Sequence, residues 1–540
     1  MSEKTGKKQI IVETIAFNLG VVVLLLLFFQ PRYEGKSDII MQTILYNVND
    51  LSNMGYLVFS NVILGKFLAA VQMLFSILPI YTSFHYGMIF IALCITTYIT
   101  SKRNINWSGK ILSAFVVLFI GYECYININY MKTAMLLIAT GYYVLIYVAK
   151  STKKIIFWCS VFVFLQMVGS LICFSAFVIS TSIFLLVMIL YYGKRIIQLK
   201  NKKLIVMIVG VAVILIAALK IIDIQCYKQY EQWSSIAETK TSIERLYSYG
   251  AGDYSYEYQE KYEIGEDEYD LMRQGLITKE SSMTPEIMND LFVENNRKAV
   301  SLESILDYFR EVPISVFELG MFYCWFVLGM VLLLSSNSRN RILLGTDCVI
   351  LLIAYYPLYI FNASDSHWIN AGVFILFIYS ALIKIQKLRL PDRGYVGAWL
   401  CVLGLLLFGN FSTELFSHSQ NDEIIFNAIR EMGENEDNGD TYAVEMIKVL
   451  GRYSPLSTHP KEFYEHDNMY YLDSFYYYYP YMNNSEFYNV LKNEDAGQKY
   501  VFVSDHIYMD GYCNLIADGK LDCEYRNTYD NMILYNIFKW

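Results

Sequence analysis

Several ionisable residues stand beside apolar stretches that are long enough to cross a membrane. They are Glu34, Asp38, Asp50, Lys132 and His367. A charge in or beside a membrane span is costly, so it is more often functional than a charge on a surface. Carboxylates and imidazoles transfer protons or bind cations, and a lysine can bind a phosphate. These residue types indicate acid–base or phosphate chemistry at a membrane surface.

Each of these residues also has a simpler interpretation. The apolar residues of 39–48 recur at helical spacing, which predicts an interfacial amphipathic helix with Asp38 near its N-cap. Asp38 could therefore serve only to cap that helix. Lys132 could extend its ammonium to the membrane surface while its stem stays among apolar groups. Lys66 and the turn that contains Asp365, His367 and Trp368 are weaker candidates.

Composition indicates what must position these residues. The chain has 540 residues, of which 55% are hydrophobic and 17% charged. Long apolar blocks lie at 21–29, 111–120, 155–190, 204–222, 316–334, 348–360, 372–383 and 396–408. Windows of this length cross a bilayer as helices, so the sequence predicts an α-helical polytopic membrane protein with about 11 or 12 spans.

One region leaves the number of spans open. Residues 56–100 contain two hydrophobic stretches where the alternation of loops requires a single crossing. Either the first stretch lies along the outer interface or re-enters the membrane, or the basic loop 101–104 is an exception to the charge rule.

Basic connections predict the orientation, because cationic loops are retained in the cytoplasm. They lie at 3–8, 101–104, 149–154, 193–203, 337–341 and 384–393. The N-terminus is therefore expected inside, and the chain after about residue 410 outside.

The predicted organisation has four parts. They are an N-terminal membrane module at 1–222 with a first outside loop at 31–55, an outside cap loop at 223–312, C-terminal membrane helices at 313–411 and a small outside α/β domain at 412–540. The acidic run 266–268 could bind a cation, but a solvated face is the simpler interpretation. The tyrosine cluster at 475–484 could stack on sugar rings or seat the domain on a neighbouring surface.

The strand-like pieces of the last part are at 443–451, 468–479, 499–505 and 532–538, with one helix at 483–493. Two of the ten cysteines, Cys513 and Cys523, flank an Asp-Gly pair that is typical of a hairpin turn. They could form a disulfide in the outside compartment. The cysteine and histidine spacing does not indicate a metal site.

The order of these parts resembles the GT-C superfamily of membrane glycosyltransferases. The shared features are an inside N-terminus, one span, an outside loop that opens with an acid and an amphipathic helix, a helical bundle and an outside soluble domain. The paired-helix block 127–177 resembles that of the superfamily. The tyrosine-rich stretch 254–277 resembles an outside loop of bacterial membrane proteins with this architecture.

The resemblance implies a polyprenyl-phosphate-linked sugar as donor, a glycan, lipid or protein acceptor and a location in the bacterial cytoplasmic membrane. It makes Asp38 the candidate catalytic base or ligand of a Mg²⁺ or Mn²⁺ ion, with Glu34 and Asp50 as substitutes. A basic residue is expected where Cys173 stands, so Lys132 is the nearest replacement for binding the lipid phosphate. The other substrate-binding candidates are Lys66, Asp365 and His367.

The departures from the superfamily pattern support a second hypothesis. The superfamily often has two adjacent acids in the first outside loop, and here Ser37 precedes Asp38 in place of the first acid. Cys173 stands where a basic residue is expected. A non-catalytic scaffold or binding protein of envelope polysaccharide assembly would account for both. A transporter is less favoured because the sequence shows no internal repeat. The formal charge of −8 and the scattered basic residues exclude nucleic acid as a partner.

Overall fold

The structure is a computed structural model, and several ranges in both halves of the chain lie outside the residues that it describes. It describes residues 2–45, 55–103, 107–150, 154–196, 202–229, 254–266, 269, 287, 290, 301, 304–308, 310, 320–334, 338–360, 367–385, 441–445, 455–456, 469–472, 499–504, 521–529 and 532–539.

The chain divides into two compact units. The first, called the membrane unit here, comprises Met1–Gly35, Thr82–Ile222 and Ala299–Phe416, and the second comprises Lys36–Tyr81, Asp223–Lys298 and Ser417–Trp540. The expected domain boundaries after residues 222, 312 and 411 stay predictions. The grouping differs from the expected one, because 36–81 belongs with the second unit and not with the N-terminal helices.

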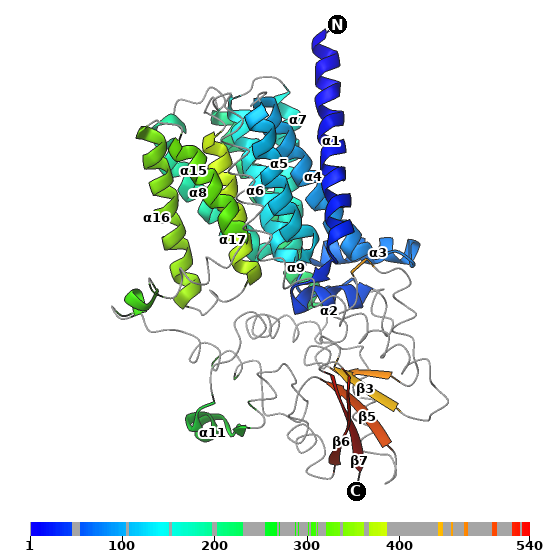
Figure 1. Ribbon diagram of the computed structural model, residues 1–540. Coiled ribbons are helices and arrows are strands. Elements are labelled where there is room, and N and C mark those ends of the chain that lie inside the picture. The colour runs from blue at the N-terminus through cyan, green and yellow to red at the C-terminus, as the bar shows by residue number, and fades with distance from the viewer. Residues whose placement is uncertain are drawn as a thin grey trace. The chain divides into compact units, whose positions relative to one another are not determined.

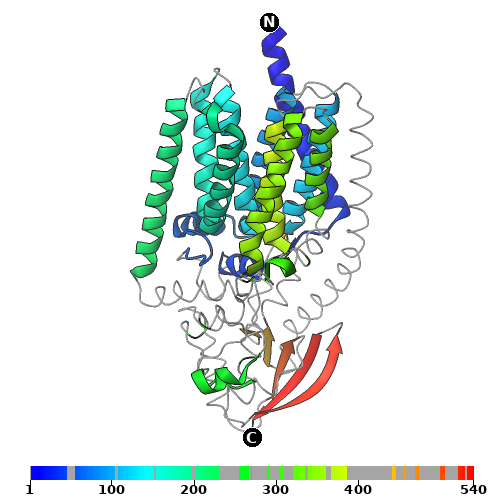
Figure 2. The same cartoon turned by 90° about the vertical axis from the view of Figure 1, so that its left-hand side faces the viewer.

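The membrane unit is built from long helices that run side by side (Figures 1 and 2). They are α1 Ser2–Phe28, α4 Ile80–Arg103, α5 Trp107–Tyr125, α6 Tyr130–Lys150, α7 Ile155–Ile172, α8 Phe174–Ile196, α9 Lys202–Lys228, α15 Gly320–Leu334, α16 Ser338–Ile360 and α17 His367–Ile385. The ends of α4 and α9 extend past the unit's limits, so the expected boundary at 222 falls inside α9.

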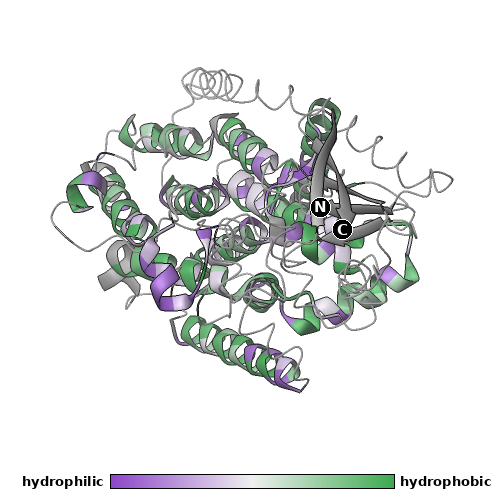
Figure 3. Cartoon of the chain, turned by 90° about the horizontal axis from the view of Figure 1, so that it is seen from below, coloured by the Kyte–Doolittle hydropathy of each residue, from purple (hydrophilic) through white to green (hydrophobic). Residues whose placement is uncertain are grey.

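The described helices confirm a polytopic α-helical membrane protein. Six have the length and apolar composition to cross a bilayer, and they contain Gln9–Phe28, Ile80–Lys102, Tyr130–Val148, Ile155–Ile172, Lys203–Lys228 and His367–Ile385. Hydrophobic residues predominate along the described helices, as Figure 3 shows, and many exposed positions on the helix faces carry large apolar side chains. Such faces suit contact with hydrocarbon, because lipid replaces water around them. The expected total of 11 or 12 spans stays a prediction, since parts of the chain lie outside the described residues.

Residues 56–100 contain one helix of spanning length. The second hydrophobic stretch forms most of α4, whereas the first forms α3, Val62–Leu74, which has only 13 residues. A helix needs about 20 residues to cross the hydrocarbon core, so α3 is too short. Phe67 and Leu74 on α3 are exposed apolar side chains. Of the two alternatives, the interfacial or re-entrant segment is favoured.

Two helices form the centre of the membrane unit. In the apolar window of α6, 100% of the residues are buried, and in that of α17 the share is 94%. The hydroxyl group of Tyr379 on α17 lies 2.6 Å from Oγ1 of Thr96 on α4 and 2.8 Å from Oγ1 of Thr140 on α6. Such bonds between helices satisfy polar groups that lipid cannot. They fix α17 against α4 and α6, and therefore fix where α17 begins.

The second unit contains short helices and a five-stranded sheet. The helices are α2 Lys36–Leu45, α3 and α11 Tyr256–Tyr262; the strands are β3 Thr441–Glu445, β4 Met469–Leu472, β5 Lys499–Ser504, β6 Leu521–Tyr529 and β7 Met532–Lys539. The order is β4-β3-β5-β7-β6, with parallel pairs on both sides of β3 and antiparallel pairs on both sides of β7. Each expected strand has a counterpart, and β6 is an additional one. The expected helix at 483–493 lies outside the described residues.

The helix expected from 39–48 forms as α2. α2 ends at Leu45, Asp38 lies in its first turn, and every side chain from Ser37 to Leu45 is buried. The polar residues Gln42 and Thr43 are buried together with the apolar ones, so the helix is covered on its polar side as well. Its interfacial position stays a prediction.

Candidate functional site

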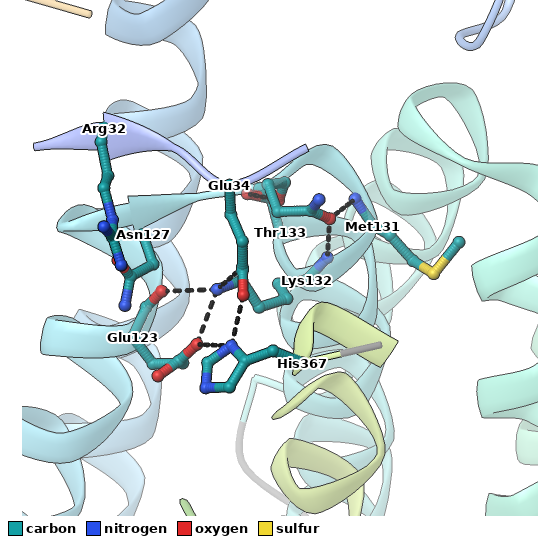
Figure 4. A network of polar contacts seen from close by, with 9 residues as sticks. Arg32, Glu34, Glu123, Asn127, Met131, Lys132, Thr133 and His367 are labelled. Atoms are coloured by element: carbon teal, nitrogen blue, oxygen red, sulfur yellow. Dashed lines mark hydrogen bonds and ion pairs between the residues drawn. The ribbon is translucent and has the colours of Figure 1, made fainter. Parts of the chain in front are cut away.

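Four helix ends of the membrane unit meet at one end of the bundle. α1 finishes at Phe28, α5 finishes at Tyr125, and α6 and α17 begin at Tyr130 and His367. Figure 4 shows the polar side chains that these ends bring together. Helix termini carry unpaired backbone groups and can hold polar side chains away from the hydrocarbon. This end is therefore where a polar site can be built in an apolar bundle.

A short strand pair fixes the chain that follows α1. β1, Arg32–Tyr33, pairs in parallel with β2, Asn127–Ile128, in the turn between α5 and α6. The backbone N–H of Arg32 donates to the carbonyl of Ile126 at 2.8 Å, and that of Glu34 donates to the carbonyl of Ile128 at 3.0 Å. These bonds place the Glu34 side chain beside the start of α6.

A buried asparagine caps α6 and thereby positions Lys132. Oδ1 of Asn129 accepts hydrogen bonds from the backbone N–H of Met131 at 2.9 Å and of Lys132 at 3.3 Å. A side-chain oxygen just before a helix stabilises its unpaired first N–H groups. The cap fixes the first turn of α6, from which the Lys132 side chain extends towards α5.

Lys132 is the buried centre of the cluster. Its Nζ lies 2.5 Å from Oε2 of Glu34 and 2.7 Å from Oε1 of Glu123, and it donates to the backbone carbonyl of Glu123 at 3.0 Å. The Lys132 side chain is 0% exposed, compared with 12% and 6% for those of Glu34 and Glu123. Two hydrogen bonds to Glu123 and an ion pair with Glu34 therefore surround this ammonium group. Lys132 is held inside the protein and is not a solvent-exposed lysine.

His367 is the exposed member of the cluster. Its Nδ1 contacts Oε1 of Glu34 and lies 3.6 Å from Oε1 of Glu123. Its side chain is 45% exposed. A carboxylate beside one ring nitrogen selects the tautomer with the proton on that nitrogen, which leaves the other nitrogen able to accept a proton. The cluster therefore presents an oriented imidazole at the end of the bundle.

The charges of the cluster support one another. Burial by itself raises the pKa of the Glu34 carboxyl. The combined effect of the nearby Lys132 and His367 is larger and lowers that pKa to about 2. Two carboxylates and one ammonium give the cluster a formal charge of −1 when His367 is neutral and 0 when it is protonated. In this arrangement the cluster accommodates positive charge more readily than an added anion.

The cluster also contains a set of atoms that fits a metal ion. One ligand atom each from Glu34, Glu123 and His367 lie within 4.8 Å of one another. Carboxylate oxygens and an imidazole suit Mn²⁺ or Zn²⁺. The ammonium of Lys132 lies among these same oxygens, so an ion could bind there only if that ammonium moved away.

The structure brings together Glu34, Lys132 and His367, three of the residues singled out from the sequence. Sequence reasoning missed Glu123, which is 4% exposed. The signal was present, because Glu123 is an acid at the end of the apolar block 111–120. An acid beside a membrane span is a functional candidate for the reason that applied to Lys132.

Asp38 belongs to the second unit, and its catalytic and metal-binding roles stay predictions. It is 0% exposed, and its Oδ1 accepts a hydrogen bond from the hydroxyl of Tyr81 at 2.7 Å. Lys66, in the same unit, is exposed, and its Nζ lies 5.5 Å from the ring centroid of Tyr56.

The remaining candidates divide between described and undescribed residues. Cys173 is buried and ends α7, where its backbone N–H donates to the carbonyl of Gly169 at 3.0 Å. Asp50, Asp365 and Cys513 lie outside the described residues. The expected disulfide between Cys513 and Cys523 therefore stays a prediction.

Comparisons with known proteins found no match in sequence and two solved structures of low similarity. No protein-family model matches the chain, and no curated protein matches it. Two solved structures of ArnT from Cupriavidus metallidurans, one bound to undecaprenyl phosphate and one in the apo state, are similar to it at 10% sequence identity. In each case the match covers 97% of both chains with a TM-score of 0.39.

Proposed function

We propose that this multi-pass membrane protein is a glycosyltransferase. It moves a sugar from a polyprenyl-phosphate carrier to a glycan, lipid or protein acceptor on the outer side of the bacterial cytoplasmic membrane. The observation that carries the proposal is the cluster of Glu34, Glu123, Lys132 and His367 at one end of the helix bundle. The sequence resemblance to the GT-C superfamily supplies the donor class.

The position of the cluster supports a reaction at the outer surface. α6 starts beside Lys132 and ends at Lys150, where the basic loop 149–154 begins. That loop is expected in the cytoplasm. The cluster is at the other end of α6, about 30 Å away at 1.5 Å per residue. A lipid-linked donor whose phosphate lies at the outer surface would meet the cluster there.

His367 is the group best placed to assist the acceptor. Sugar transfer needs a base that takes the proton from the attacking hydroxyl. Glu34 orients the imidazole by its contact with Nδ1, and the exposed side chain leaves Nε2 as the proton acceptor. We assign this role to His367, with Glu34 as the positioning residue. Asp38 is the competing candidate from the sequence.

The second hypothesis, a non-catalytic scaffold of envelope polysaccharide assembly, is favoured by one observation. The ammonium of Lys132 is already engaged by an ion pair with Glu34 and by two hydrogen bonds to Glu123. A phosphate would have to displace a carboxylate to bind this lysine. The cation expected to stabilise the departing phosphate is therefore not offered in this arrangement.

Release of the lipid carrier tests the proposal. Full-length protein in proteoliposomes would receive polyprenyl-phosphate-linked sugars of several classes together with a bacterial envelope extract that supplies glycan, lipid and protein acceptors. Mass spectrometry would measure the free polyprenyl phosphate formed as the sugar passes to an acceptor hydroxyl. We expect release by the wild type and its loss in His367→Ala and Glu34→Gln. Asp347→Asn is a matched control, because Asp347 forms another buried carboxylate–lysine pair, with Lys384. Its activity per folded molecule should be retained.

Each other outcome has a definite meaning. If the wild type binds the carrier but releases no polyprenyl phosphate from any donor, the scaffold hypothesis replaces the glycosyltransferase hypothesis. If His367→Ala stays active and Asp38→Asn is inactive, the protein is an enzyme but the base is Asp38.

A further inference from the structure

A second polar feature of the membrane unit lies away from the cluster. A cavity of about 460 Å³ is lined by α1, α4 and α5. Its polar lining comes from Glu13, Thr14, Thr97, Ser101, Lys110 and Ser113. On α5, Lys110 and Ser113 lie near the start, whereas Glu123 of the cluster lies near the end. The cavity and the cluster are therefore at different ends of the bundle.

Two of the lining residues lie near the ends of candidate membrane spans. Glu13 is in the second turn of the candidate span Gln9–Phe28, and Ser101 is in the last turn of Ile80–Lys102. The polar headgroup region of a bilayer begins where such spans end. The apolar part of the lining includes Phe17 and Ile111, as acyl chains require.

Two buried polar atoms near the cavity have unfilled bonding capacity. Ser113 is 4% exposed, and within the described chain its Oγ has no hydrogen-bond partner. Asn18, which donates to Oγ1 of Thr97 at 3.1 Å, is likewise left with an unpartnered Oδ1 among the described residues. A buried hydroxyl without a partner is unfavourable, and more so in a membrane that supplies no water. A bound ligand with polar atoms at this position would satisfy Ser113.

The charged residues of the lining are of opposite sign. Lys110 and Glu13 are both exposed, so they lie at the rim, and Nε2 of Gln9 donates to Oε1 of Glu13 at 2.9 Å. A purely anionic headgroup would be attracted by Lys110 but repelled by Glu13. A zwitterionic headgroup with a phosphate and an ammonium complements both.

We propose that this cavity binds a phospholipid of the phosphatidylethanolamine type. Lys110 binds the phosphate, Glu13 binds the ammonium, Ser113 donates to an oxygen of the glycerol ester region, and the acyl chains follow the apolar lining. Basic pockets between membrane helices are known lipid headgroup sites. The acid opposite the lysine makes this one selective for the zwitterion. The proposal is independent of the glycosyltransferase function.

Native mass spectrometry of the full-length protein in detergent tests this site. The protein would be titrated with phosphatidylethanolamine, with phosphatidylglycerol, and with diacylglycerol, which lacks the headgroup. We expect one saturable phosphatidylethanolamine per protein and weaker binding of the other two. Lys110→Gln should lower the affinity for phosphatidylethanolamine roughly fivefold. Glu13→Gln should reduce the preference for phosphatidylethanolamine over phosphatidylglycerol by a similar factor. Ser113→Ala should lower the affinity for all three diacyl lipids by a smaller factor.

The control is Lys203→Gln, which removes an exposed lysine at the start of α9, outside the cavity. Its lipid binding should match the wild type. The proposal is overturned if Lys110→Gln and Glu13→Gln bind both phospholipids as the wild type does. It is also overturned if diacylglycerol binds as tightly as phosphatidylethanolamine, because the cavity would then recognise only acyl chains.

Discussion

The ammonium of Lys132 lies 2.5 Å from the carboxylate of Glu34, although Glu34 follows strand β1 and Lys132 lies in the first turn of α6, far away in the sequence. The β1–β2 pair holds one residue and the Asn129 cap holds the other. Their ion pair joins the segment after α1 to the start of α6. Among the described residues, the carboxylates of Glu34 and Glu123 lie beside Nδ1 of His367.

Removing the ammonium should destabilise the protein strongly. Lys132→Met would leave Glu34 and Glu123 buried without their cation, and breaking such a pair costs about 3–5 kcal/mol. We expect a large drop in the midpoint of thermal unfolding in detergent. The double variant Lys132→Met with Glu123→Gln should recover part of the loss, because one uncompensated charge is gone. Equal midpoints for Lys132→Met and the wild type would contradict the ion-pair cluster.

Replacing His367 should separate stability from activity. Its side chain is 45% exposed, so His367→Ala should shift the unfolding midpoint little. Loss of a general base lowers rates about 10²- to 10⁴-fold, which the release of polyprenyl phosphate would measure. His367→Gln preserves a hydrogen bond to Glu34 but cannot accept the proton, so it should be equally inactive. Activity in His367→Gln near the wild-type level would exclude the imidazole as the base.

Acid should lower the stability of the folded protein, because Glu34 becomes protonated. The pKa of Glu34 is lowered from 4.5 to about 2, so the folded state binds this proton less readily than the unfolded state. The stabilisation is complete above about pH 4.5 and is lost as the pH falls towards about 2. Wild type and Glu34→Gln should therefore differ most in unfolding midpoint near neutral pH and converge in acid. A difference that stays constant down to about pH 3 would contradict the lowered pKa.

The α6 cap should contribute to both helix and cluster. Asn129→Ala removes the acceptor for two backbone N–H groups, which costs about 1 kcal/mol. Because the cap fixes the turn that carries Lys132, the variant should also lower activity. Asn129→Asp keeps an acceptor and should retain most of the helix stability. An Asn129→Ala variant with wild-type unfolding would show that this cap is dispensable.

A divalent ion should compete with Lys132 for the cluster. Manganese titrations followed by electron paramagnetic resonance should show weak binding to the wild type. The variant Lys132→Ala, which vacates the place among Glu34, Glu123 and His367, should bind Mn²⁺ more tightly. Tight binding by the wild type that is lost in Asp38→Asn would instead support the metal site expected at Asp38.

The sequence by itself determined that the chain is a helical membrane protein, because apolar blocks of spanning length have no other stable arrangement in lipid. It also singled out Glu34, Lys132 and His367, since charges beside spans are conspicuous in an apolar chain. Local patterns likewise predicted α2 and the strand-like pieces of the C-terminal part.

Only the tertiary structure decided which of these residues meet. A charge pattern along the chain does not reveal that the ends of α1, α5, α6 and α17 converge, because interhelical packing and hydroxyl contacts such as those of Tyr379 set their relative positions. The fold added Glu123 to the cluster and gave Lys132 two carboxylate partners in place of a free surface position. The membrane explains why the pairing is required, because a buried ammonium in a medium without water must find its counter-charges within the protein.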